Sequence, residues 1–354
     1  MEKRKIQLVG RSTLTVSLPN SWVKKTGLKK GEVITITPER DGSLRIFKGE
    51  ASTETQKACV IKADLYQEGE SIERLIVAGY INGFDVIKVF SSGRLKSNII
   101  EAIREAEFKL IGLNIVEETS SYVILQCSIN PLMFPIDVTL RRLYTLFLIM
   151  LEEAIQALKE ANLELAEDAR RREKEANRIY LLILRLLNEA QKNPSMAQKI
   201  GLNDVEDILT MNIIANILER MADWAEKIAE EIEKVEEKGI GVSEKTKNII
   251  EEYAKKIRDL TEKAVKSVIN TDANLANSVA NSFKKVLEPE AYKIIEENLY
   301  PEMLFEALLL RRIIGNLHRV GEIAVGIAEV AIDRAVREME QFIESSEQKA
   351  LEEK

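Results

Sequence analysis

The chain has 354 residues, of which 45% are hydrophobic, 31% are charged and 5% are aromatic. That length and composition predict an ordinary soluble protein of two or three domains, each with its own buried core. Cys59 and Cys127 are the only cysteines, which excludes a disulfide framework and a paired-cysteine zinc site and favours a reducing cytoplasm. The longest apolar run, at 143–151, is far shorter than the ~20 residues that a membrane-spanning helix needs. Because Met1 lies so close to the first predicted strand, we expect no targeting segment and a cytoplasmic location.

The charge is distributed unevenly along the chain. Residues 1–50 contain 11 Lys and Arg against five Asp and Glu, a net charge of +6, whereas the whole chain carries −7. The remaining residues therefore carry −13. This polarity favours a basic N-terminal head that faces nucleic acid and an acidic body that does not.

The head is predicted to contain four short strands and one helix. Alternating side chains indicate strands at 5–9 and 13–18, with Gly10 at the bend between them. Pro19 suits the first turn of a helix of about two turns, which Gly27 ends. Further strands are expected at 33–37 and 43–47, joined by a turn at Asp41-Gly42. A piece of this size buries little surface alone, so we expect it to dimerise.

Two stretches of the head carry a family resemblance. They are Gly10-Arg11-Ser12-Thr13-Leu14-Thr15-Val16-Ser17-Leu18-Pro19 and Thr26-Gly27-Leu28-Lys29-Lys30-Gly31-Glu32. Over residues 3–47 the chain resembles the SpoVT/AbrB family of DNA-binding domains. The resemblance implies that two chains interleave their hairpins into one small β-barrel whose basic side chains contact double-stranded DNA.

The DNA-contacting residues that this resemblance implies are Lys3, Arg4, Lys5, Arg11, Lys24 and Lys25. Arg11 is favoured because a guanidinium can pair through two hydrogen bonds with guanine or phosphate. The alternative is that these cations are solvated surface groups and that the head serves only for dimerisation or protein contact.

After a polar link at 50–57, the pattern changes to alternating strands and helices. Strands are predicted at 59–64, 85–90, 112–118 and 121–127, and helices at 71–82 and 95–109. The chain contains neither a G-x-x-x-x-G-K-S/T nor a G-x-G-x-x-G string, so Gly79, Gly83 and Gly93 are interpreted as turn residues. A small α/β sandwich is expected here.

From residue 136 onward the apolar residues follow a helical period. Helices are predicted at 136–160, 164–189, 203–236, 243–270, 273–287, 290–298 and 301–344. Breaks are expected at Asn193-Pro194, Lys238-Gly239, Asn270-Thr271 and Glu288-Pro289. Segments 218–230 and 317–329 also match each other in Leu, Arg, Ala, Ile, Ala and Glu, at a separation of 99 residues. A duplicated helical bundle follows from this repeat.

Each copy of the repeat places polar groups four residues apart on one helix face. Glu219 and Asp223 form this pair in the first copy, and His318 and Glu322 form it in the second, so each pair could hold one cation. A competing interpretation is that such spacing is common on charged helices and that Arg220 or Arg319 neutralises the carboxylates.

This arrangement resembles the paired bundles of the PhoU family of phosphate-homeostasis proteins. The family's motif, an acidic residue followed four residues later by Asp, implies surface iron or zinc clusters, and Glu173 would add a ligand from a neighbouring helix. Asn177 stands where the family has a carboxylate, and Asn277 and Asn281 occupy the matching positions of the second bundle. These departures put a complete cluster in doubt, most of all in the second bundle.

The sequence does not indicate an enzyme. His318 is the only histidine, and no nucleophile or orienting group stands at a recognisable spacing from it. Glu219 and Asp223 could serve as an acid and base pair, but nothing else marks a concave substrate site.

The predicted fold is therefore multidomain and mainly α: an N-terminal β-barrel of swapped hairpins, a small α/β sandwich, and two tandem three-helix bundles. The predicted domains are 1–49, 57–130, 134–239 and 243–345. The predicted function is a dimeric, DNA-binding negative regulator of phosphate uptake whose bundles sense transporter state, a metal or an effector. One alternative is an adaptor that binds components of a phosphate transporter or a signalling protein and uses the head only to dimerise. Another is a metal-handling helical protein.

Overall fold

The computed structural model describes residues 3–38, 42–48, 56–298 and 304–352. The chain divides into two compact units, residues 1–57 and 58–354. The predicted link at 50–57 lies mostly outside the described residues, as does Asp41 of the predicted turn.

The described residues of the first unit form two separate hairpins and one helix. Strands β1 (Gln7–Val9) and β2 (Thr13–Thr15) pair antiparallel, with Leu8 opposite Leu14. Strands β3 (Ile34–Pro38) and β4 (Leu44–Lys48) form the second antiparallel pair. Between them lies α1 (Asn20–Thr26), which begins after Pro19 and ends at Gly27, a residue in the left-handed conformation at φ 61°. The predicted helix is confirmed, and the strands of the first hairpin are shorter than expected.

The predicted barrel is not present in the single chain. Within the described residues, β1 and β2 form one two-stranded sheet and β3 and β4 form another. A closed barrel would need further strands, such as those of a second chain. Interleaving of two chains therefore stays a prediction.

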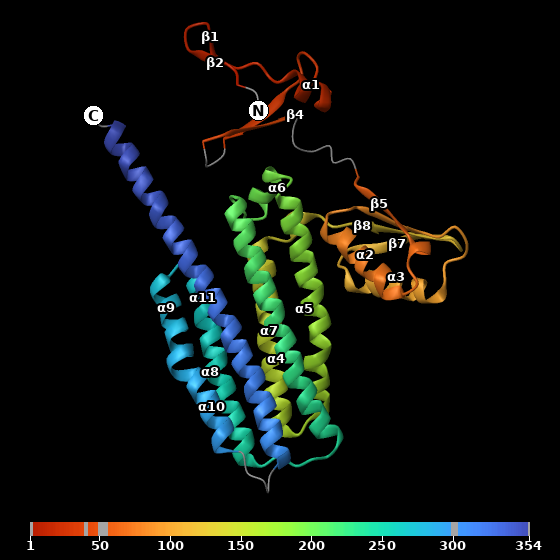
Figure 1. The fold of residues 1–354 in the computed structure, drawn as a ribbon, viewed down its shortest axis with the longest axis vertical. Coiled ribbons are helices and arrows are strands. Elements are labelled where there is room, and N and C mark those ends of the chain that lie inside the picture. The colour runs from red at the N-terminus through yellow and green to blue at the C-terminus, as the bar shows by residue number, and fades with distance from the viewer. Residues whose placement is uncertain (1–2, 39–41, 49–55, 299–303, 353–354) are drawn as a thin grey trace. The chain divides into compact units, whose positions relative to one another are not determined.

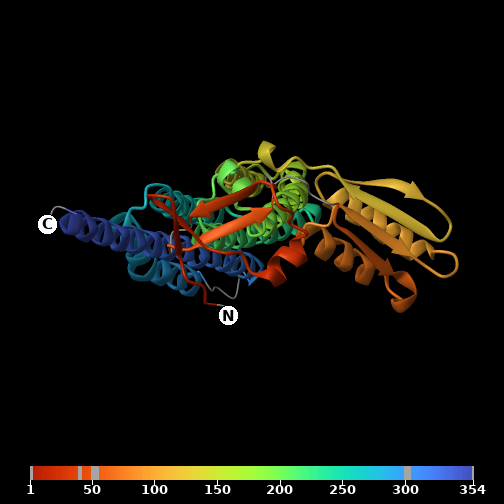
Figure 2. The ribbon, with the colours of Figure 1, turned by 90° about the horizontal axis from the view of Figure 1, so that it is seen from above.

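The second unit begins with a two-layer α/β region. A mixed sheet contains β5 (Ala58–Lys62), β6 (Val86–Phe90), β7 (Leu113–Glu118) and β8 (Tyr122–Cys127) in the order β5-β6-β8-β7. The β5 and β6 strands are parallel, and β8 runs antiparallel to both of its neighbours. Helices α2 (Gly69–Ile81) and α3 (Ser97–Lys109) lie against one face of the sheet (Figures 1 and 2). The predicted α/β sandwich is thus confirmed, with bounds shifted by one or two residues.

The remainder of the second unit is helical and consists of two three-helix groups. The first contains α4 (Ile136–Glu160), α5 (Leu163–Ala190) and α7 (Val205–Glu237), with the short α6 (Pro194–Lys199) between the last two. The second contains α8 (Glu244–Ile269), α11 (Leu304–Glu352) and a bent segment between them. That segment is α9 (Ala273–Ser282), the π-helical turn η3 (Phe283–Leu287) and α10 (Glu288–Glu297).

One helix prediction is wrong, and one helix is not predicted. The expected break at Glu288-Pro289 is a continuous helical path, in which the π-helical turn η3 leads directly into α10 and Pro289 lies in the first turn of α10. The expected break at Asn193-Pro194 is confirmed, because α5 ends at Ala190, but the short helix α6 that begins at Pro194 is not predicted. Asn193 accepts a hydrogen bond from the backbone N–H of Met196 at 3.1 Å and so caps α6.

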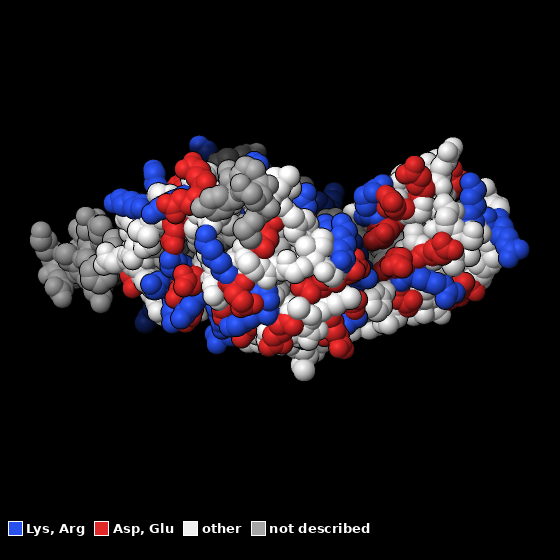
Figure 3. All heavy atoms as spheres, turned by 90° about the horizontal axis from the view of Figure 1, so that it is seen from below, with Lys and Arg blue, Asp and Glu red and all other residues white. Residues whose placement is uncertain are grey.

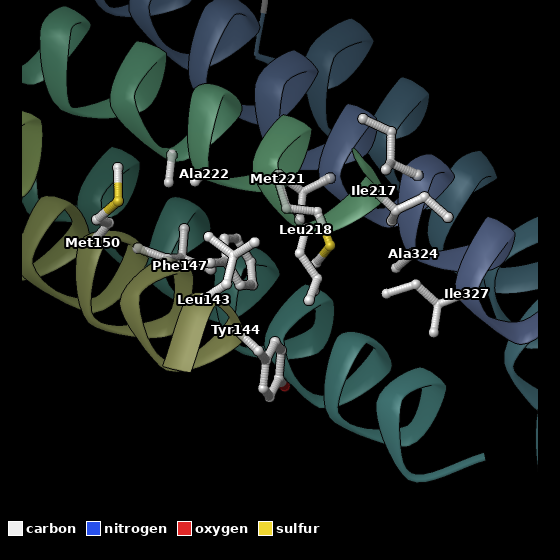
Figure 4. Close-up of a cluster of buried hydrophobic side chains, with 14 of the residues drawn as sticks. Leu143, Tyr144, Phe147, Met150, Ile217, Leu218, Met221, Ala222, Ala324 and Ile327 are labelled. Carbon is white, nitrogen blue, oxygen red and sulfur yellow. The ribbon is translucent and has the colours of Figure 1, made fainter. Parts of the chain in front are cut away.

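The two helical groups share one hydrophobic core. It extends from Leu143 and Phe147 on α4 through Met221 on α7 to Ala324 and Ile327 on α11, all buried (Figure 4). Helices α7 and α11 run antiparallel. Two ion pairs show this: Arg312 pairs with Glu231 near one end, and Arg337 pairs with Asp207 near the other. The predicted boundaries between domains of the second unit stay predictions.

The α/β region is joined to the first helical group by a buried arginine. Arg185 of α5 has 3% of its surface exposed and donates to the backbone oxygens of Tyr80 and Phe84, each at 2.9 Å. It also pairs with Asp85 at 3.1 Å and with Glu189 at 2.9 Å. Leu181, one turn earlier, belongs to the core of the α/β region. The contact therefore combines apolar packing with a satisfied buried charge.

Candidate functional site

The predicted DNA-contacting cations come from three segments of the first unit. Lys3, Arg4 and Lys5 precede β1, Arg11 lies in the turn between β1 and β2, and Lys24 and Lys25 occupy the last turn of α1. All six are exposed. Arg4 donates from Nη1 to the Ser17 hydroxyl at 2.8 Å, which fixes its guanidinium beside the first hairpin.

Two other charged residues of the head have a structural role that the sequence did not indicate. Lys48 donates from Nζ to the Gly27 carbonyl at 2.8 Å and lies 3.3 Å from a Glu32 carboxylate oxygen. Glu32 also accepts from the Lys29 backbone N–H, and this bond is the main reason that the Glu32 pKa is lowered. Lys48 thus joins β4 to the end of α1, and so we do not assign it to DNA contact.

The apolar side chains of the head are exposed. Leu14 is 67% exposed, Leu8 62%, Val33 75% and Leu44 63%. Among the residues of this unit whose burial the structure describes, none is buried. The described part of the head therefore has no core of its own within one chain.

A second site lies on the helical unit, where carboxylates from α5 and α7 gather. Glu219 and Asp223 share one face of α7, as predicted, and their charges interact with each other and with Glu173 of α5. Burial, reinforced by the Asp223 and Glu173 charges, raises the pKa of Glu219 to about 7. Burial is also the main cause of the raised pKa values of Asp223 and Glu173.

Glu226 belongs to the same carboxylate cluster but was not predicted from the sequence. Burial, reinforced by the charges of Glu173, Glu230 and Asp223, raises its pKa to about 7. Glu226 lies seven residues after Glu219, and residues seven apart share a helix face, so this spacing could have predicted it from the sequence. Glu219 and Glu226 therefore change their protonation near neutral pH.

The geometry does not form a complete metal site. Across the described ranges, no three His, Cys, Asp or Glu side chains are arranged so that they could hold a metal ion. Asn177 occupies the position on α5 where the resemblance implied a further carboxylate. Binding of iron or zinc at Glu173, Glu219 and Asp223 stays a prediction, and no step of the proposed function depends on it.

The corresponding pair in the second bundle, His318 and Glu322, makes contacts with other side chains. Glu322 accepts a hydrogen bond from Arg319 at 2.5 Å. The His318 ring stacks on Phe283 at 5.2 Å between centroids and lies 5.7 Å from the Tyr292 ring. Burial lowers the pKa of His318, so its ring is neutral near pH 7. These contacts favour a packing role for His318 over the predicted role as a metal ligand.

Within the described residues, no helix combines the length and the apolar content that crossing a bilayer requires. Lys and Arg lie next to Asp and Glu over the face of the molecule shown in Figure 3.

The family comparison finds a match within the first helical group. The PhoU domain family matches residues 140–232, which contain Glu173, Glu219 and Asp223. The match covers most of α4, all of α5 and most of α7. The crystal structure of PhoU from Pseudomonas aeruginosa is similar over 57% of this chain and 95% of its own, with 22% identity and a TM-score of 0.48. A search of the curated proteins finds no match to the chain. The SpoVT/AbrB resemblance of the head stays a prediction.

Proposed function

We propose that this protein is a dimeric, DNA-binding regulator of phosphate uptake, in which the basic head contacts the duplex and the helical unit receives the signal. The PhoU family match at residues 140–232 supports the link to phosphate uptake. The observation that supports DNA binding is the exposure of the head: its six candidate cations are exposed, and so are several of its apolar side chains.

The exposed apolar side chains support dimerisation. Leu8, Leu14, Val33 and Leu44 each expose more than 60% of their surface, which is unfavourable for a folded unit in water. A second head would cover them, and interleaved hairpins would close the barrel that one chain cannot form. Dimerisation would also double the number of cations available to one duplex, and phosphate contacts supply much of the affinity of such proteins.

Regulation requires that the head bind DNA with different affinities in two states of the helical unit. Glu219 and Glu226 are one place where such a difference could arise, because burial raises the pKa of each to about 7 and their charge therefore changes near neutral pH. On this proposal the protein represses phosphate-uptake genes, and a signal at the bundles lowers its occupancy of DNA.

The dimer and its DNA contacts are tested together with the full chain. Sedimentation should give a dimer at micromolar concentration, and fluorescence anisotropy should show binding to duplex DNA that weakens as salt rises. Arg11→Ala removes two cations per dimer, so the slope of log affinity against log salt should fall by about two. The matched control is Lys245→Gln on α8, which should leave the slope unchanged. A monomeric chain, or a chain with no affinity for duplex DNA at about 50 mM salt, would overturn the proposal.

A second candidate is an adaptor that binds a transporter component or a signalling protein. It is favoured by three apolar side chains on one face of α7: Val205 is 56% exposed, Leu209 54% and Ile213 50%. Their spacing of four residues forms a stripe that a partner could cover. The candidate predicts that phosphate-transporter components bind the wild type, that Leu209→Asp abolishes this binding, and that duplex DNA is not retained.

A further inference from the structure

A cavity between the two helical groups has no role in the proposed function. Its volume is about 900 Å³, within the range of about 300–1,000 Å³ that is usual for small-molecule sites. Its walls come from α7, from the end of α9 with η3, and from α11. Because these elements belong to both groups, a ligand here would contact both at once.

Three cations converge on this cavity from three elements: Arg220 of α7, Lys284 of η3 and Arg319 of α11. Arg319 is neutralised by Glu322. Arg220 and Lys284 are exposed, and neither makes an ion pair with any residue that the structure describes. The Arg220 charge also acts on Glu219 and Asp223 and partly offsets the rise in their pKa values. Arg220 and Lys284 can both donate to an anionic group such as phosphate.

The cavity also contains acceptors and aromatic surface. Glu288 and Glu329 line it and make no ion pair within the described ranges, so their oxygens are available to hydroxyl or amino donors. The Trp224 and Phe283 rings form part of its wall. Lys227 lies over one face of the Trp224 ring, 3.9 Å from its centroid.

The local backbone is shaped to bring these groups together. Residues 283–287 form a π-helical turn, a feature that often marks functional sites, and it contributes both Phe283 and Lys284 to the cavity. The Phe283 ring fits against α11 only because residue 321 is glycine: a Cβ there would lie 2.6 Å from a ring carbon. A larger residue at position 321 would displace one wall of the cavity.

We propose that this cavity binds a nucleotide. Its phosphate would pair with Arg220 and Lys284, its ribose hydroxyls would donate to Glu288 or Glu329, and its base would pack on Trp224. A nucleotide is the ligand class that combines an anion, hydroxyl donors and a flat aromatic ring, which are the three features that this lining can satisfy. The inference does not depend on DNA binding by the head.

The test uses the full chain with Trp22→Phe, which leaves Trp224 as the only tryptophan and thus as a fluorescent reporter in the cavity. Titration with AMP and ATP should change its emission to saturation. Arg220→Gln and Lys284→Gln should each weaken binding about tenfold or more, since each removes a charge-assisted hydrogen bond. Lys285→Gln is the matched control, because Lys285 is exposed in the same turn and does not line the cavity. It should leave the affinity unchanged.

Two further ligands, adenosine and inorganic phosphate, test whether the cavity binds the whole nucleotide or only one part of it. Adenosine should bind more weakly than AMP, because it lacks the phosphate, and inorganic phosphate at the same concentration should not displace AMP. The proposal is overturned if emission does not saturate with any nucleotide, if phosphate alone displaces AMP, or if Lys285→Gln weakens binding as much as Lys284→Gln. Circular dichroism of each variant distinguishes loss of the site from loss of the fold.

Discussion

The buried contact of Arg185 gives the sharpest prediction about how the second unit holds together. Arg185→Met keeps an unbranched side chain of similar length but removes the donors to the Tyr80 and Phe84 carbonyls and the partner of Asp85 and Glu189. Removing one partner of a buried ion pair typically costs about 3–5 kcal/mol. We therefore expect the free energy of unfolding to fall by about 3–5 kcal/mol.

The assay is urea unfolding followed by circular dichroism, with hydrogen exchange of the backbone amides at 80–85 as a local probe. Those amides should lose protection first, since Arg185 binds this segment directly. The control is Arg171→Met on the same helix: the Arg171 side chain is 62% exposed, and its partners Glu167 and Asp168 are 43% and 41% exposed, so the cost should stay below about 1 kcal/mol. Equal effects of the two substitutions, or a loss below about 1 kcal/mol for Arg185→Met, would refute the reasoning.

Two further predictions concern the helical unit. The raised pKa of Glu219 means that the folded state holds its proton more tightly than the unfolded state; stability should fall as pH rises from about 4.5 to about 7 and then level off. Glu219→Gln should remove that part of the pH dependence of the melting temperature, whereas Glu237→Gln, an exposed change on the same helix, should keep it. Gly321→Ala should destabilise by about 1–3 kcal/mol in urea unfolding because its Cβ would clash with Phe283. Gly315 lies on the same helix, and a Cβ added there meets no atom within 4 Å, so Gly315→Ala should instead stabilise the folded state. A larger loss of stability for Gly315→Ala than for Gly321→Ala would contradict the packing at Phe283.

Helix positions were predictable where the apolar period was long and the ends carried clear signals. The predicted helix at 136–160 matches α4 without change, because its period is uninterrupted and Pro135 precedes it. At 289 a proline that predicts a break lies in a continuous helical path, whereas at 194 the predicted break is present and the proline also begins the short helix α6. The sequence alone does not distinguish the two uses, since the choice depends on whether the preceding backbone can supply a cap or a π-helical turn.

The candidate sites were predictable only where their residues share one helix. Glu219 and Asp223 follow from their spacing, whereas Arg185 binds residues about 100 positions away and depends on how α5 packs against α2. His318 has the same spacing from Glu322, but the aromatic rings of Phe283 and Tyr292 decide its environment. Tertiary packing therefore separates two pairs that look equivalent in the repeat.

The most direct test of the central claim is a genome-wide map of where the protein binds DNA, taken with and without phosphate limitation. We expect wild-type protein to occupy sites upstream of phosphate-transport genes, to change its occupancy when phosphate is limiting, and to lose these sites in the Arg11→Ala variant. A map without enrichment at such genes, or one that Arg11→Ala leaves unchanged, would contradict the account.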